Sequence, residues 1–118
     1  MIDFAEKVKR GLPIDDILII DGHNHLGLLA SFHGPKETAE DMLVNMDALG
    51  INVACISAHA AIGPDYIYGN NLVIDTVNKY PERFIGYVTV NPNYQEEIKA
   101  EMDRCFKVPQ MRGIKVHP

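Results

Sequence analysis

The sequence predicts an α/β fold in which parallel strands alternate with helices. Short apolar runs typical of buried strands alternate with segments whose apolar residues recur at helical spacing. This alternation favours a parallel sheet with right-handed crossovers. The apolar runs end near residues 21, 57, 90 and 116. Each β-α unit therefore takes roughly 30 residues, which is ordinary for such a unit.

The N-terminal segment predicts a short helix and a buried strand. Residues 2–10 place Phe4, Ala5 and Val8 on one helical face, and Gly11 follows as a stop. The apolar run 17–21 predicts the first strand, which leads into residues 22–25, and a loop is expected after these to about residue 35.

The next unit is a helix over 37–49 followed by a strand over 51–57. Thr38 and Asp41 resemble a capping box at the start of the helix. Gly50 is a typical residue for its C-terminal end. A long loop is expected over 59–69, because Gly-Pro-Asp lies within it.

The remaining elements repeat the pattern. A helix over 70–80 ends at Pro81, and the run 84–90 predicts the third strand. A further amphipathic helix is expected over 94–106, and a fourth strand over 112–116.

The length of the units suggests a larger architecture than four strands. Eight units of this size would need roughly 250 residues, the usual size of a TIM-type (β/α)8 barrel. We therefore interpret residues 1–118 as one partial barrel domain holding the first four strands. The alternative is an open, doubly wound α/β sheet with helices on both faces. A half barrel leaves one sheet face and two edges uncovered, so we expect a continuation of the chain or self-association.

Charge and composition limit the classes of partner that this chain is expected to bind. The net charge of −5 and the lack of a basic patch argue against nucleic-acid binding. No apolar run approaches the ~20 residues that span a bilayer, and the charged N-terminus does not resemble a secretory signal. Cys55 and Cys105 lie on apolar faces and are expected to be buried thiols, which favours a reducing, cytoplasmic location.

The strongest chemical motif is Asp-Gly-His-Asn-His, directly after the first strand. In an extended segment alternate residues share a side, so Asp21, His23 and His25 are expected to face one way. Two imidazoles so placed can bind one divalent metal, with Asp21 orienting a ligand from behind. The competing interpretation is a pair of surface histidines in a loop.

Other strand ends supply candidates for substrate binding. His59 follows the second strand, Asn91 the third, and Lys115 and His117 share a side at the fourth. A buried Lys115 needs a carboxylate partner or a chemical modification, and carboxylation to bridge two metals is one option. Each of these residues also has an ordinary structural explanation.

Three loop residues carry weaker signals. His33 is expected in a lid or at the surface rather than as a ligand. Tyr66 and Tyr68 either line the mouth of a pocket or are ordinary loop aromatics. Motifs for nucleotide binding, serine hydrolysis and dithiol redox chemistry are absent from the sequence.

Three stretches, IIDGHNH at 19–25, KYPERFIGYVTVNP at 79–92 and RGIKVHP at 112–118, resemble the amidohydrolase superfamily. The most similar branch is the amidohydrolase-related metal-dependent hydrolases, which includes aminocarboxymuconate-semialdehyde decarboxylase. The resemblance implies a distorted β/α barrel holding divalent metal, often zinc, with His23 and His25 as ligands from the first strand. Further ligands in that branch follow later strands, beyond the fourth.

The resemblance also implies a small-molecule substrate. The expected activity is hydrolysis of an amide, ester or related C–N or C–O bond by metal-activated water. The alternatives are non-oxidative decarboxylation within the same superfamily, and a non-catalytic truncated module for association or metal binding.

Overall fold

The computed structural model describes residues 3–29 and 37–117. Four parallel strands form one sheet in the order β1-β2-β3-β4. The strands are β1 Ile20–Leu26, β2 Val53–Ala58, β3 Phe84–Val90 and β4 Met111–Val116. The helices are α1 Phe4–Lys9, α2 Ala39–Leu49, α3 His59–Ile62, α4 Tyr66–Lys79 and α5 Gln95–Cys105. The predicted alternation and parallel sheet are confirmed.

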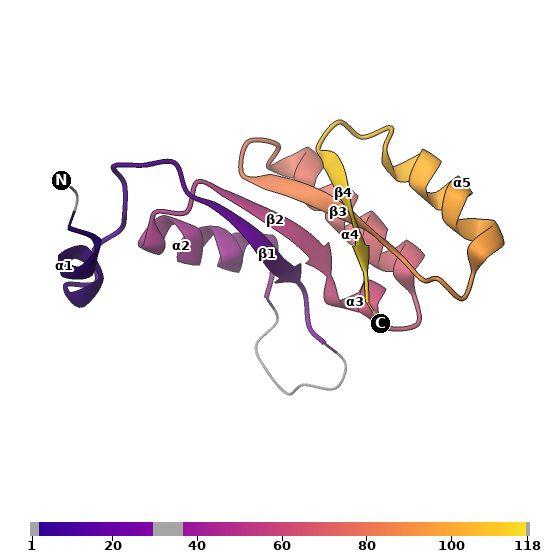
Figure 1. Cartoon of the computed structure of the whole chain (residues 1–118), viewed down its shortest axis with the longest axis horizontal. Helices are drawn as coiled ribbons and strands as arrows, with labels where there is room; N and C mark the ends of the chain where they lie inside the picture. The colour runs from indigo at the N-terminus through magenta and orange to yellow at the C-terminus, as the bar shows by residue number, and fades with distance from the viewer. Residues whose placement is uncertain (1–2, 30–36, 118) are drawn as a thin grey trace.

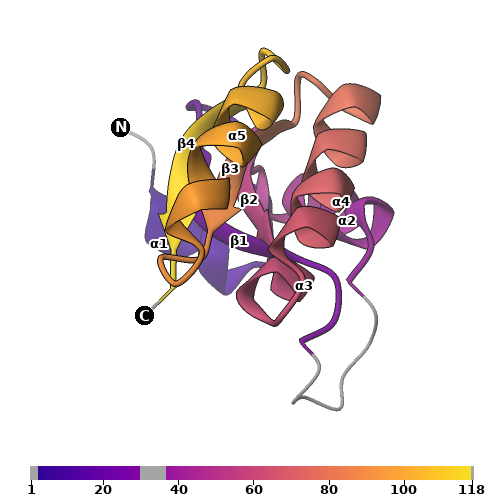
Figure 2. The same cartoon turned by 90° about the vertical axis from the view of Figure 1, so that its right-hand side faces the viewer.

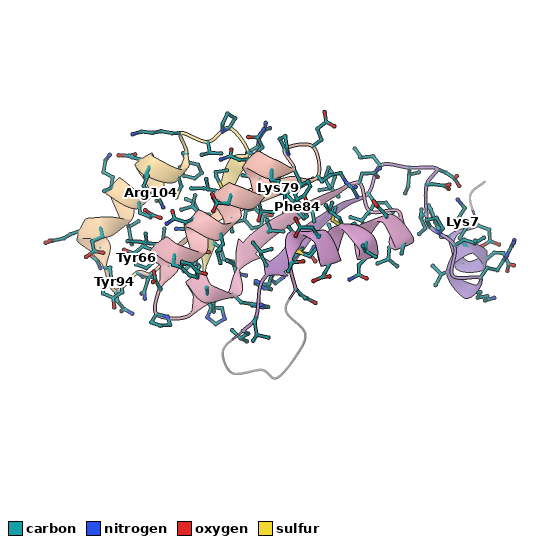
Figure 3. All side chains as sticks on the ribbon, turned by 180° about the vertical axis from the view of Figure 1, so that it is seen from behind. Lys7, Tyr66, Lys79, Phe84, Tyr94 and Arg104 are labelled. Carbon is teal, nitrogen blue, oxygen red and sulfur yellow. The ribbon has the colours of Figure 1, made fainter. Side chains whose placement is uncertain are left out.

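One face of the sheet is covered by helices and holds the core. In Figure 1 the strands lie in front of α2 and α4, and in Figure 3, seen from behind, these helices lie in front. Hydrogen bonds from Lys79 and Tyr80 to Glu40 join α4 to α2, and the hydrogen bond from Tyr66 to Glu97 joins α4 to α5. The three helices therefore form a single layer over side chains such as Val73 and Phe84, both fully buried.

Figure 2 shows α2 and α4 on one side of the sheet, and Figure 1 shows that α1 lies beyond the end of the strands. Among the described residues no helix is packed against the opposite face. The doubly wound alternative, with helices on both faces, is therefore wrong. The radius of gyration of 15.7 Å exceeds the ~13.5 Å expected for a compact chain of this length. The chain forms an open, four-stranded section of a β/α barrel, as the unit spacing predicted.

The first strand differs from its prediction over 17–21. β1 begins at Ile20, later than predicted, and runs through the histidine motif to Leu26, beyond the predicted end at residue 21. The residues before it are exposed, Ile17 at 43% and Leu18 at 69%. Ile17 and Leu18 precede the first β1–β2 pair, Ile20 with Val53, which accounts for their exposure.

The loop predicted over 59–69 is largely helical. α3 follows β2 directly, and α4 begins at Tyr66, where the Asp65 carboxylate accepts a hydrogen bond from the Tyr68 backbone N–H. The Gly-Pro-Asp turn is thus an N-terminal cap rather than part of a long loop. The predicted capping box of Thr38 and Asp41 is confirmed at the start of α2.

Two β-bulges determine which side chains face away from the helices. One lies in β1 between Asp21 and Asn24, and the other displaces β4 against β3 between Met111 and Gly113. A Cβ at Gly113 would meet the Tyr87 ring, which places Gly113 on the face of Tyr87. Regular alternation then puts Lys115 on that same face.

Both cysteines are free and buried, as predicted. Burial raises the pKa of Cys105 to about 12, with the Glu101 carboxylate adding to the shift. Among the described helices, none combines the length and apolar character needed to cross a bilayer.

Candidate metal centre

The two histidines of β1 converge on one point at the carboxyl end of the sheet. The Nε2 atoms of His23 and His25 lie 3.1 Å apart. Two imidazole nitrogens bound to one tetrahedral zinc at about 2.0–2.1 Å are separated by about 3.3 Å. The pair therefore has the spacing that a single metal ion requires, and it belongs to an extended strand, as the alternation argument assumed, rather than to a surface loop.

The His25 imidazole is held from two sides. Its Nδ1 lies 3.1 Å from the Ser57 hydroxyl on β2, a contact that leaves Nε2 available to a metal. The ring of His59 stacks on it at a centroid distance of 4.5 Å. The His59 Nδ1–H donates to the Gly27 carbonyl at 2.7 Å, which fixes that ring in turn.

The electrostatic surroundings keep His25 neutral. Burial first of all, and then the nearby charges of His59, His23, Lys115 and His117, together lower its pKa to about 4. A neutral imidazole is the form that binds a metal ion.

The side chain of Asp21 is separated from the histidine rings by the bulge in β1. Its carboxylate accepts a hydrogen bond of 3.1 Å from the His23 backbone N–H. Asp21 and Asn24 both line a small cavity against α2. The alternation argument that put Asp21 on the histidine side assumed a regular pleat, so it does not hold across this irregularity. A role for Asp21 in orienting a ligand stays a prediction.

Lys115 reaches the histidine pair from the far edge of the sheet. Its Nζ lies 3.3 Å from Nε2 of His23, across 92 positions of the sequence. Between them on the same face, the Tyr87 hydroxyl on β3 donates to the Gly22 carbonyl at 3.0 Å. That hydrogen bond ties β3 to the bulged part of β1.

The remaining candidates are placed as follows. The Asn91 side chain accepts a hydrogen bond from the Asn93 backbone N–H, which closes a local turn, and its contact with substrate stays a prediction. His117 is among the groups that lower the pKa of His25, and its contact with substrate stays a prediction. His33 falls outside the described residues.

Tyr66 and Tyr68 differ in their surroundings. Tyr66 is buried, donates to Glu97 and stacks on Tyr94 in the helix layer (Figure 3). Tyr68 is 54% exposed and lines a cavity between α2 and α4. Both residues belong to α4, so the interpretation as ordinary loop aromatics is wrong. A contact of Tyr68 with substrate stays a prediction.

Within the described residues no group of three or more His, Cys, Asp or Glu side chains surrounds a metal position. The chain thus offers two converging nitrogens, one fewer than the three protein ligands of a typical catalytic zinc. Sequence analysis missed three residues on this face: Ser57, Tyr87 and Thr89. Alternation within the second and third strands was the available signal, since each is a polar or amphipathic residue facing away from the helix layer.

The fold and the position of the polar side chains indicate the class of protein. The chain is a section of a β/α barrel whose polar side chains gather at the carboxyl ends of the strands, where such folds place their chemistry. A family model described as amidohydrolase matches residues 20–118. The chain belongs to the amidohydrolase family.

Comparisons with individual proteins show a similar fold in solved structures. A comparison with curated proteins found no match. The crystal structure of 2,6-dihydroxybenzoate decarboxylase from Rhizobium is similar, with 19% identity and a TM-score of 0.67. A structure of 2,6-dihydroxybenzoate decarboxylase complexed with 2,6-dihydroxybenzoate matches with 19% identity and a TM-score of 0.62. The match covers 85% of this chain but 38% of the decarboxylase chain in both, so this chain spans less than half of their length.

Proposed function

We propose that this chain supplies the first two ligands, His23 and His25, of a divalent metal centre in an enzyme acting on a small molecule. The observation that carries the proposal is the 3.1 Å approach of their Nε2 atoms. Zinc is the proposed metal, because imidazole nitrogen at tetrahedral spacing suits it. The buried free cysteines support a reducing compartment such as the cytoplasm.

The proposed reaction is hydrolysis of an amide, ester or related C–N or C–O bond. A divalent metal held there would supply Lewis-acid polarisation of a carbonyl and activation of water. Ser57 and His59 would keep the His25 ring oriented, and Tyr87 would hold β1 in place. Non-oxidative decarboxylation is the second candidate, favoured by the fold likeness to 2,6-dihydroxybenzoate decarboxylase.

Metal content tests the proposal. Purified wild-type chain is expected to retain about one zinc per site, whereas His23→Ala and His25→Ala lose it. Ser57→Ala removes only the partner of His25 Nδ1, so its zinc affinity is expected to fall by about 10–100-fold. Equal, negligible zinc in wild type and both histidine variants would contradict the proposal. Bound zinc with turnover of neither esters, amides nor aryl carboxylates would favour a non-catalytic module.

We also propose that the open sheet associates through its edges. The edge strands carry exposed apolar side chains, Ile20 at 53%, Ile114 at 50% and Val116 at 51%. Pairing β4 of one copy with β1 of another would cover both edges and close eight strands. Sedimentation velocity of this chain should show a dimer that charged substitution at Ile114 dissociates, and a monomer at all concentrations would refute the idea.

A further inference from the structure

The Lys115 ammonium contacts Nε2 of His23, which is the atom proposed to bind the metal. Within residues 3–29 and 37–117 it approaches Nε2 of His23 and forms no ion pair with a carboxylate. A histidine nitrogen has one lone pair, so His23 Nε2 cannot accept from Lys115 and bind a metal at once. Metal binding would leave two cations side by side without a partner for the ammonium.

A second polar group beside Lys115 is also unsatisfied. Thr89 pairs with Lys115 in the β3–β4 register, and register partners in a parallel sheet direct their side chains to the same face. The Thr89 side chain is 2% exposed, and its Oγ1 has no hydrogen-bond partner among the described residues. Buried hydroxyls are normally paired, so an orphan at a site calls for an explanation.

We propose that Lys115 and Thr89 form an anion-binding pair that holds a carboxylate group of the substrate beside the metal. This inference rests on the proposed function and adds the class of substrate and the residues that select it. The negative charge would compensate both the ammonium and the divalent ion, and the Thr89 hydroxyl would donate a second hydrogen bond to the carboxylate. Lys115 would act as a fixed charge, without covalent modification.

Binding of benzoate and of its neutral analogue benzamide to the zinc-loaded chain tests the pair. Titration calorimetry or NMR line broadening gives both affinities without any turnover. Wild type is expected to prefer benzoate by at least tenfold. Lys115→Met should abolish that preference, whereas Lys115→Arg, which keeps the charge and cannot be carboxylated, should keep affinity within about threefold. Lys107→Met is the matched control, because Lys107 is an exposed lysine in the turn between α5 and β4, before the strand begins.

The outcomes separate the two proposals. Wild-type chain that binds no zinc contradicts the proposed function. Zinc binding with equal benzoate affinity in wild type and Lys115→Met overturns the anion pair alone. An Arg variant as weak as the Met variant also overturns it, since a modified lysine would then be required. Thr89→Val should weaken benzoate severalfold at unchanged zinc affinity, and no change would remove Thr89 from the pair.

Discussion

A buried asparagine, Asn70 on α4, takes the place of a missing strand neighbour. β2 pairs with β3 only as far as Gly86, while β3 continues against β4 to Val90. Beyond that point the Asn70 carboxamide accepts from the Thr89 N–H at 2.8 Å and donates to the Thr89 carbonyl at 3.0 Å. It also donates to Glu101 at 2.9 Å. Asn70→Leu, a substitution of similar shape, removes all three hydrogen bonds.

The magnitude follows from the groups left unpaired. A buried polar group without a partner costs about 1–3 kcal/mol, so loss of the three partners should destabilise by about 3–5 kcal/mol. A chain of this size has a total stability of roughly 6–18 kcal/mol. At about 4 °C per kcal/mol, the midpoint of thermal unfolding should fall by about 12–20 °C.

Urea and thermal unfolding followed by far-UV circular dichroism measure the loss. Asn71→Leu is the matched control, because Asn71 is the exposed neighbour on the same helix. Its free energy of unfolding should stay within about 0.5 kcal/mol of wild type. An Asn70→Leu variant within about 1 kcal/mol of that control would refute the view that the carboxamide completes the β3 backbone.

The remaining predictions concern charge and packing in the helix layer. Burial raises the pKa of Glu101, but hydrogen bonds from Arg104, Asn70 and Cys105 outweigh it and leave the pKa below 4.5. The stability from Glu101 should therefore be fully present above pH 4.5 and fade as the pH falls through the lowered pKa. Urea midpoints of wild type and Glu101→Gln should converge in acid, and a constant gap would contradict this sign. Gly69→Ala should lower the free energy of unfolding by about 1–3 kcal/mol in the same assay, because the new Cβ would lie 2.4 Å from the Cβ of Ala61. An unchanged free energy of unfolding would show that α3 moves aside without cost.

Elements with local signals were predictable from the sequence. Thr38 and Asp41 form the expected capping box, and Gly50 ends α2 with a φ of 81°. The third strand occupies its predicted range of 84–90, because its apolar residues alternate toward a helix layer that does exist. These features depend on neighbours a few positions away, so residue type and spacing determine them.

The arrangement of the site was only partly predictable, because it depends on irregular pairing. The pattern located His23 and His25, but the bulge in β1 made the expected side of Asp21 unreliable. The contact of Lys115 with His23 joins the two edge strands of the sheet, and no local pattern encodes it. Asn70 was equally hidden, since its partners lie on a strand and a helix that follow it.

The polar groups on the two faces of the sheet have different surroundings. On the helix side the polar groups of Asn70 and Glu101 satisfy one another, so the core needs no ligand to form. On the other face, contacts from Ser57 to His25 and from Tyr87 to Gly22 already hold the histidines in place. The two histidine rings are therefore positioned by contacts within the protein. The unsatisfied Thr89 hydroxyl lies on this second face, and the proposed anion-binding pair would give a partner to a buried polar group that otherwise costs stability.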